Sequence, residues 1–323
     1  MKRETQASIS LRISVTDRCD LRCAYCRTAD STPLAPRKDV LSCAEILDFT
    51  RGLKSSYDVT KVRLTGGEPL IRRDIVELVK RLADEDIPDL ALTTNGRDLA
   101  ELAAPLRDAG LGRVNISLDT LDAETWEKLT GNPDLDPTLA GIDAALDAGL
   151  APVKLNTVVL RGVNDDEIVA IARYGIERGC EVRFLELMPI GPAAAFHTAC
   201  FVTSTEVREK LERAFALEPL GREPDAASRN FRARDGDDRA GIVGLISPCS
   251  EPFCSNCRRL RLTASGKLLG CLAQADGIDV RPILAMGPPE REQHLASAVE
   301  QAFALKETHR RFDDQKPMVR IGG

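Results

Sequence analysis

The stretch TDRCDLRCAYC, residues 16–26, carries three cysteines, Cys19, Cys23 and Cys26, and follows directly on a strand predicted over residues 11–15. The spacing C-x-x-x-C-x-x-C places three thiolates on one short loop. A cubane iron–sulfur cluster that only carries electrons is normally bound by four cysteines. Three thiolates leave one iron without a protein ligand, so this loop predicts a cluster at which a small molecule completes the coordination.

Two other uses of these cysteines fit the chain less well. A disulfide framework is typical of secreted proteins, and the opening residues MKRETQ are not followed by the apolar segment of a signal peptide. A structural zinc site needs four ligands, and none of the histidines, His197, His294 and His309, is near the loop in sequence. Zinc stays open as an alternative.

Outward from the loop, short β-branched strands alternate with amphipathic helices as far as residue 188. The predicted strands cover residues 11–15, 61–65, 91–94, 113–118, 153–159 and 181–187, and the predicted helices cover residues 44–53, 74–83, 99–109, 139–148 and 166–178. Ser42 and Glu45 form a predicted capping box, and Gly110 and Gly149 are predicted helix stops. This repetition predicts an α/β fold, an incomplete (βα)6 TIM-like barrel whose ligands bind at the carboxyl ends of the strands.

The alternation stops after residue 192, so we place a domain boundary there. Residues 1–195 are predicted to form the partial barrel, and residues 196–323 a smaller C-terminal domain. Residues 219–238 are predicted to be loop with weak strand, residues 241–247 and 260–269 strands, and residues 290–306 a helix. Because a second cysteine group lies between the two strands, we expect this domain to bind a second cluster and to close the barrel mouth.

The segment GGEP, residues 66–69, ends the second predicted strand. Glycine permits positive φ and a close approach of the backbone to a ligand. Thr94, Asn95 and Ser117 end the next two strands, where their side chains can reach the same ligand or form turns and caps. The sequence thus predicts one ligand site at this edge of the sheet.

The second cysteine group, Cys254, Cys257 and Cys271, again supplies three thiolates and not four. Zinc with Cys249 as the fourth ligand is one alternative. The other is a second cubane whose open iron faces a substrate.

Basic residues lie on strands that should otherwise be buried. Arg259 and Arg261 share one face of a predicted strand, and guanidinium groups match phosphate oxygens. Basic residues of the earlier strands that can join the same anion site are Arg12, Lys61, Arg63, Lys154 and Arg183. The pattern predicts a polyanionic ligand inside the barrel.

Composition narrows the class of protein. A chain of 323 residues with 43% hydrophobic content indicates a globular protein of one large domain or two of ordinary size. A net charge of −6 with scattered positive residues argues against a nucleic-acid polymer as partner, and no apolar run reaches the length of a membrane span. Ten cysteines fit a reducing compartment, so we expect a cytoplasmic protein with no membrane partner.

The first cysteine loop and the GGEP turn together resemble the radical S-adenosylmethionine (SAM) superfamily. The resemblance implies that Cys19, Cys23 and Cys26 hold a [4Fe-4S] cluster whose open iron is chelated by the methionine moiety of SAM. The cofactor contacts that it implies are Tyr25, Gly66, Gly67, Glu68, Thr94, Ser117 and Lys154.

The two three-cysteine groups, the Arg-x-Arg pair and the ending VRIGG, residues 319–323, resemble the GTP 3′,8-cyclase family. The resemblance implies a second [4Fe-4S] cluster on Cys254, Cys257 and Cys271, which binds the guanine of GTP. The substrate contacts that it implies are Arg12, Lys61, Arg63, Arg183, Arg259 and Arg261, and the catalytic positions are Arg259, Arg261, Gly322 and Gly323.

This resemblance implies a radical SAM lyase or cyclase that converts GTP to 3′,8-cyclo-7,8-dihydro-GTP in molybdenum cofactor (molybdopterin) biosynthesis, with a 5′-deoxyadenosyl radical removing the ribose 3′ hydrogen. It also implies an electron donor and a next-step enzyme that makes cyclic pyranopterin monophosphate, and it leaves a homodimer open. The alternatives are a two-cluster paralogue acting on another nucleotide or a peptide, and a non-catalytic metal-binding interaction module.

Overall fold

The computed structural model describes residues 6–27, 34–221, 226–254, 257–274 and 277–308. Six strands run parallel in the first part of the chain. They are β1 (Ser8–Ser14), β2 (Asp58–Thr65), β3 (Asp89–Thr94), β4 (Arg113–Ser117), β5 (Lys154–Val159) and β6 (Glu181–Glu186). All six match predicted strands to within a few residues, which confirms the βα repeat.

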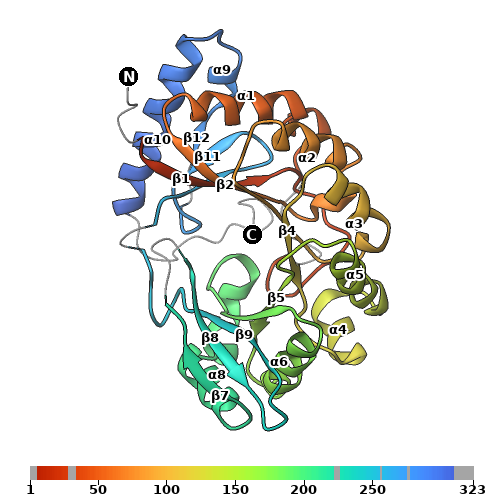
Figure 1. Cartoon of the computed structure of the whole chain (residues 1–323). Coiled ribbons are helices and arrows are strands. Elements are labelled where there is room, and N and C mark those ends of the chain that lie inside the picture. The colour runs from red at the N-terminus through yellow and green to blue at the C-terminus, as the bar shows by residue number, and fades with distance from the viewer. Residues whose placement is uncertain (1–5, 28–33, 222–225, 255–256, 275–276, 309–323) are drawn as a thin grey trace.

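Helices follow these strands and cover one face of the sheet (Figure 1). They are α1 (Cys43–Lys54), α2 (Ile75–Ala83), α3 (Leu99–Asp108), α4 (Ala123–Thr130), α5 (Asp136–Asp147) and α6 (Ile168–Glu177). Helix α1 begins with the predicted capping box, in which the Glu45 amide donates to Ser42 Oγ at 3.2 Å and the Ser42 amide donates to Glu45 Oε2 at 2.8 Å. Helix α4 was not predicted; Asp122 caps its start and Gly131, at φ 68°, ends it.

Alternation along each strand separates an outer apolar face from an inner polar face. In β1, Ile9, Leu11 and Ile13 are at most 2% exposed and pack in the main core, whereas Ser10 and Arg12 lie on the opposite face. The apolar residues of the other strands join the same core under the helices. The core therefore lies between sheet and helices, and the inner face is left to polar residues.

The segment after β6 continues the same sheet at both of its edges. It contains β7 (Ala216–Pro219), β8 (Ser228–Arg234), β9 (Ala240–Ile246), β10 (Arg259–Leu262), β11 (Lys267–Leu269) and β12 (Ile278–Asp279), with helices α7 (His197–Cys200), α8 (Ser204–Glu212), α9 (Arg281–Leu284) and α10 (Glu290–Thr308). Strand β9 pairs in parallel with β6, and β10 pairs in parallel with β1. The order is β12-β11-β10-β1-β2-β3-β4-β5-β6-β9-β8-β7, so the two predicted C-terminal strands lie far apart in the sheet.

The sheet stays open between its end strands β12 and β7, which confirms an incomplete barrel. Within the segment predicted to be loop with weak strand, residues 228–234 form the regular strand β8, which pairs along its length with β9. In Figure 1, α9 and α10 lie beside β11 and β12, while α8 lies with β7, β8 and β9 at the other end. The division at residues 195 and 196 stays a prediction.

Within the described chain, no helix combines the length and apolarity that spanning a lipid bilayer requires.

Candidate functional site

The first cysteine loop docks on the Gly-Gly turn. The Gly67 amide donates to Thr16 O at 2.8 Å, and the Glu68 amide donates to Arg18 O at 2.7 Å. A Cβ atom on Gly67 would lie 2.1 Å from Arg18 O, and one on Gly66 would lie 2.4 Å from Thr16 O. Glycine is required here because two backbone segments approach closely. The sequence predicts that this close approach serves a ligand, and in the structure the cysteine loop is its partner.

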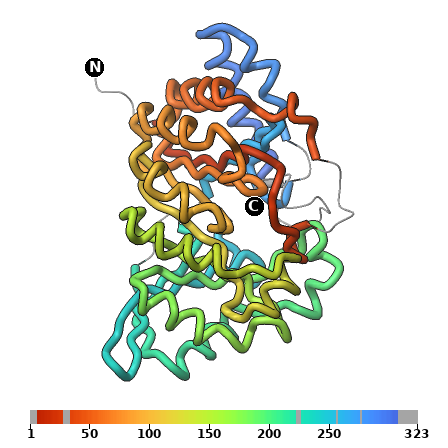
Figure 2. The backbone as a smooth tube through the Cα atoms, turned by 90° about the vertical axis from the view of Figure 1, so that its right-hand side faces the viewer, coloured from red at the N-terminus to blue at the C-terminus, as the bar shows by residue number. Residues whose placement is uncertain are grey.

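The other side of the cysteine loop is held by α4. The amides of Arg22 and Ala24 donate to the carbonyl oxygens of Thr130 and Leu129, each at 2.8 Å. Figure 2 shows this loop, coloured dark red, beside the green segment that follows β6. Tyr25 packs there in a small apolar cluster with Leu129 and Ala193. The loop is therefore fixed from three directions.

The thiols of the first group suit a positively charged cluster. Cys19, Cys23 and Cys26 are all partly buried. Burial raises the pKa of Cys19 and Cys23, and the neighbouring thiols and carboxylates raise it further. Thiols with so high a pKa ionise when a cation lies beside them, and the irons of a cubane supply that charge. The donor set therefore fits the predicted [4Fe-4S] cluster.

Glu68 is a buried carboxyl beside this loop, only 2% exposed. One oxygen accepts from the Leu70 amide at 2.9 Å and from Thr94 Oγ1 at 2.7 Å, and the other accepts from the Asn95 amide at 2.7 Å. Burial raises its pKa to about 8. The carboxyl is thus fixed in position, and Thr94 serves to orient it; direct contact of Thr94 with a cofactor stays a prediction.

Tyr25 is anchored by a residue that the sequence analysis missed. Its hydroxyl donates to Asp119, whose other oxygen accepts from the Val158 amide at 2.8 Å. Burial raises the pKa of Asp119 to about 6. Asp119 lies two residues beyond Ser117 at the end of β4. The expectation that polar residues at the ends of strands reach the ligand, which selected Ser117, could also have selected Asp119. Ser117 itself is partly buried at that end.

The register of the sheet brings the predicted cations together on its inner face. Arg12 lies opposite Arg63 on one side and Arg261 on the other. Lys154 and Arg183 lie on β5 and β6, with Lys154 ion-paired to Glu181. Along each strand, the residues that alternate with these cations face the apolar core. The predicted anion site is therefore one surface, assembled from five strands.

These cations repel one another electrostatically. Burial and then neighbouring guanidinium groups lower the pKa of Arg12 and Arg63. The same causes, with burial again first, lower the pKa of Arg261 to about 10 and that of Lys154 to about 8. Buried like charges disfavour folding unless a counter-charge is bound. The inner face is thus suited to a polyanion.

The second cysteine group lies beside these arginines. Cys257 Sγ accepts from Arg259 Nε at 3.2 Å and from Lys306 Nζ at 3.0 Å. Although burial acts in the opposite direction, these two cations lower the pKa of Cys257 to about 7. Burial and then Cys271 and Cys257 raise the pKa of Cys254.

Helix α10 closes over this group. A Cβ atom on Gly270 would lie 2.1 Å from Ala302 O in that helix. Gln274 Oε1 accepts from the Gly270 amide at 2.7 Å and from the Cys271 amide at 3.0 Å. Lys306, in the last turn of the helix, was missed because nothing local in the sequence links it to Cys257.

The zinc alternative gains no support from Cys249. Its thiol donates to Leu187 O at 3.5 Å, and its amide donates to Glu186 Oε2 at 3.0 Å. Among the residues that the structure describes, no three His, Cys, Asp or Glu side chains are placed to hold a metal ion directly.

Three further inner-face residues were missed, namely Arg113, Asn115 and Asn156. Arg113 donates twice to Asp89, and Asn115 is fully buried. The sequence contains the information needed to find them. Each is a polar residue two or four positions from a predicted site residue on the same strand, and therefore on the same face. The predicted Gly322 and Gly323 lie outside the described residues.

Comparison with known proteins gives the same picture. A model described as the radical SAM superfamily matches residues 13–175, and one described as Molybdenum Cofactor Synthesis C matches residues 180–312. A GTP 3′,8-cyclase of Moorella thermoacetica is 44% identical over 322 residues, covering 97% of each chain. A GTP 3′,8-cyclase of Saccharophagus degradans is 43% identical over 312 residues, covering 96% of this chain and 92% of the relative.

A solved structure shares the fold. The structure of Streptococcus suis SuiB bound to S-adenosylmethionine aligns with a TM-score of 0.61 and 17% identity, covering 90% of this chain and 68% of SuiB.

Proposed function

Because the chain belongs to the radical SAM superfamily and, within it, to the GTP 3′,8-cyclase family, we propose that it converts GTP to 3′,8-cyclo-7,8-dihydro-GTP. Its cofactors are SAM and two [4Fe-4S] clusters. The reaction belongs to molybdenum cofactor biosynthesis, as the match of residues 180–312 supports.

The first cysteine group holds the cluster that, when bound, supplies the electron for cleaving SAM. Cys19, Cys23 and Cys26 are its ligands. Glu68, fixed by three hydrogen bonds, offers a carboxyl near them for the amino group of the methionine moiety. Asp119 orients Tyr25 on the opposite side of the loop.

The second cysteine group is proposed to place the guanine. Cys254, Cys257 and Cys271 hold the second cluster, and Lys306 and Arg259 stabilise the Cys257 thiolate. Because β10 begins two residues after Cys257, Arg259 and Arg261 are the cations next to the proposed guanine site. The base and the phosphates are thereby held at fixed relative positions, which favours an intramolecular ring closure.

The observation that carries the proposal is the buried, mutually repelling set of cations on the inner face. A triphosphate offsets this charge because it carries several negative charges within one short ligand, whereas a peptide does so only where it is rich in carboxylates. Arg12 and Arg63 lie at the centre of the set, directly opposite each other. Their guanidinium groups hold the triphosphate while the ribose faces the SAM site.

The finer assignments are part of the same proposal. The protein receives electrons from a reducing donor and passes its product to the enzyme that makes cyclic pyranopterin monophosphate. It works in the cytoplasm, and a homodimer is compatible with the chain.

Anaerobic incubation of the reconstituted protein with SAM, dithionite and GTP tests the proposal. We expect 5′-deoxyadenosine and the cyclised nucleotide to appear together while GTP is consumed. A Cys19→Ala variant is the control, since it should form neither. If the parent protein cleaves SAM but leaves GTP unchanged, the activity belongs to a paralogue with another substrate.

A further inference from the structure

We propose that Arg113, aimed by Asp89, is a further ligand of the nucleotide and binds its terminal phosphate, so that this pair favours triphosphates over shorter nucleotides. The inference rests on the proposed function, because it adds a residue and a specificity to that anion site.

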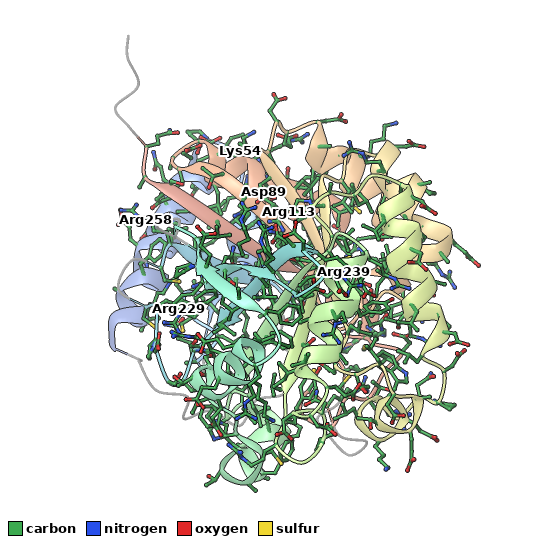
Figure 3. All side chains as sticks on the ribbon, turned by 60° about the horizontal axis from the view of Figure 1, so that its bottom comes forward. Lys54, Asp89, Arg113, Arg229, Arg239 and Arg258 are labelled. Carbon is green, nitrogen blue, oxygen red and sulfur yellow. The ribbon has the colours of Figure 1, made fainter. Side chains whose placement is uncertain are left out.

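Arg113 and Asp89 form a two-pronged ion pair at the start of neighbouring strands. Arg113 Nε donates to Asp89 Oδ1 and Nη2 donates to Asp89 Oδ2, both at 2.8 Å. Lys61 Nζ also lies 3.1 Å from Asp89 Oδ2. Figure 3 labels Asp89 and Arg113 side by side. A bidentate pair of this kind fixes the plane of the guanidinium group.

One nitrogen of Arg113 is left for a ligand. Its Nη1 is buried and has no hydrogen-bond partner within the described part of the chain. The side chain is 12% exposed, so bulk water does not readily satisfy this donor. A buried donor without a partner costs about 1–3 kcal/mol, and a ligand oxygen removes that cost.

Arg113 also belongs electrostatically to the predicted anion site. Burial is the largest cause that lowers the pKa of Arg63, Lys154 and Arg183, and Arg113 lowers the pKa of each of them further. These three residues lie on β2, β5 and β6, so Arg113 on β4 is central among them. A phosphate that reaches Arg63 and Lys154 therefore comes within the field of Arg113.

The position of β4 assigns the terminal phosphate. The order β10-β1-β2-β3-β4 places β4 four strands from β10, which carries Arg259 and Arg261 beside the second cysteine group. In a curved sheet of this kind, strands four apart lie on opposite walls. With the guanine at the second cysteine group, the far end of the nucleotide, its terminal phosphate, lies toward Arg113.

The test uses anaerobically reconstituted protein and measures Kd for GTP, GDP and inorganic tripolyphosphate by calorimetry. Arg113→Met should weaken GTP and tripolyphosphate about 10- to 100-fold, the size of a lost charge-assisted contact. GDP should weaken by less than about threefold, because it lacks the phosphate concerned. Arg51→Met is the matched control, since Arg51 pairs with Glu85 at 2.6 Å on the protein surface.

The Asp89→Asn variant tests whether Asp89 orients the guanidinium group of Arg113 or acts only as a nearby negative charge. This change removes a negative charge near the site, so a mere counter-ion role predicts tighter GTP binding. If Asp89 orients Arg113, the variant should instead show a smaller preference for GTP over GDP than the parent protein. Iron content and thermal unfolding of each variant check the fold, and Arg113→Lys, which keeps the charge but loses the fork, replaces Arg113→Met if that variant is unstable.

Equal losses for GTP and GDP, or an unchanged preference in both Arg113 variants, would overturn the inference. Failure of the proposed function can be distinguished from failure of this inference, because the binding of tripolyphosphate requires no cyclisation. A parent protein that binds tripolyphosphate through Arg113 but forms no cyclised nucleotide would retain the inference and lose the function.

Discussion

Replacing Gly67 by alanine should remove the first cluster while leaving the rest of the protein folded. The added Cβ would lie 2.1 Å from Arg18 O, a distance that real contacts do not reach, so the loop or the turn must move. Overpacking of this kind costs about 1–3 kcal/mol. Movement also breaks the bonds from the Gly67 amide to Thr16 O and from the Glu68 amide to Arg18 O. At about 0.5–1.5 kcal/mol each, these bring the total to about 2–6 kcal/mol.

This cost falls on the docking of one loop. Even the lower value of about 2 kcal/mol shifts the balance between docked and undocked loop about 30-fold. The outer apolar core, which holds the sheet and helices, does not include the turn glycines. We therefore expect loss of the first cluster, with global unfolding little changed.

The assay is iron and acid-labile sulfide analysis together with SAM cleavage by the anaerobically reconstituted variant. The parent should hold about eight irons and Gly67→Ala about four, since only the second cubane remains. Gly236→Ala is the matched control, because nothing lies within 4 Å of its added Cβ atom. A Gly67→Ala protein with the parent's iron content and SAM cleavage would refute the docking argument.

Three other outcomes can be measured. Cys19→Ala should abolish 5′-deoxyadenosine formation and leave the second cluster detectable by electron paramagnetic resonance; undiminished formation would count against the ligand assignment. Arg261→Ala should weaken GTP binding about 10- to 100-fold, as expected for a lost charge-assisted contact, while SAM cleavage without substrate persists; unchanged GTP affinity would place the anion site elsewhere. Because burial first, and then Arg183, lower the pKa of Lys154 to about 8, GTP affinity should be highest below pH 8 and fall as the pH rises through it. The Lys154→Met variant should lose this component of a calorimetric pH series, and an identical pH dependence in both proteins would exclude Lys154 as its source.

The sequence predicted the barrel because its signals are local. Each strand of the first half shows its own alternation, and the capping box at Ser42 and Glu45 is contained within four residues. Helix α4 was missed because it is only eight residues long and its apolar face is short. The places of β9 and β10 were missed for another reason. Which edge of a sheet a strand joins depends on packing between distant segments, and no local pattern encodes it.

The candidate site divides in the same way. Three cysteines on one loop can be seen in the sequence, as can Arg259 and Arg261 at a spacing of two. The pairing of Arg113 with Asp89 depends on the register between β3 and β4, where Arg113 lies opposite Ala91. The contact of Lys306 with Cys257 spans 49 residues and requires α10 to pack over the second cysteine group. Register and helix packing are properties of the folded chain, so these residues could be identified only in the structure.

The two faces of each barrel strand explain how one sheet can carry so much buried charge. On β1, Leu11 and Ile13 are at most 2% exposed in the core, while Arg12, between them, lies among repelling guanidinium groups. Burying apolar side chains such as these contributes about 1.5–3 kcal/mol each, which offsets the unfavourable charge on the inner face. A bound polyanion removes the repulsion itself, so ligand binding and folding stability are coupled through the same residues. The cations of the inner face can therefore remain without a counter-charge when the ligand is absent, because the stability of the sheet comes from its outer face.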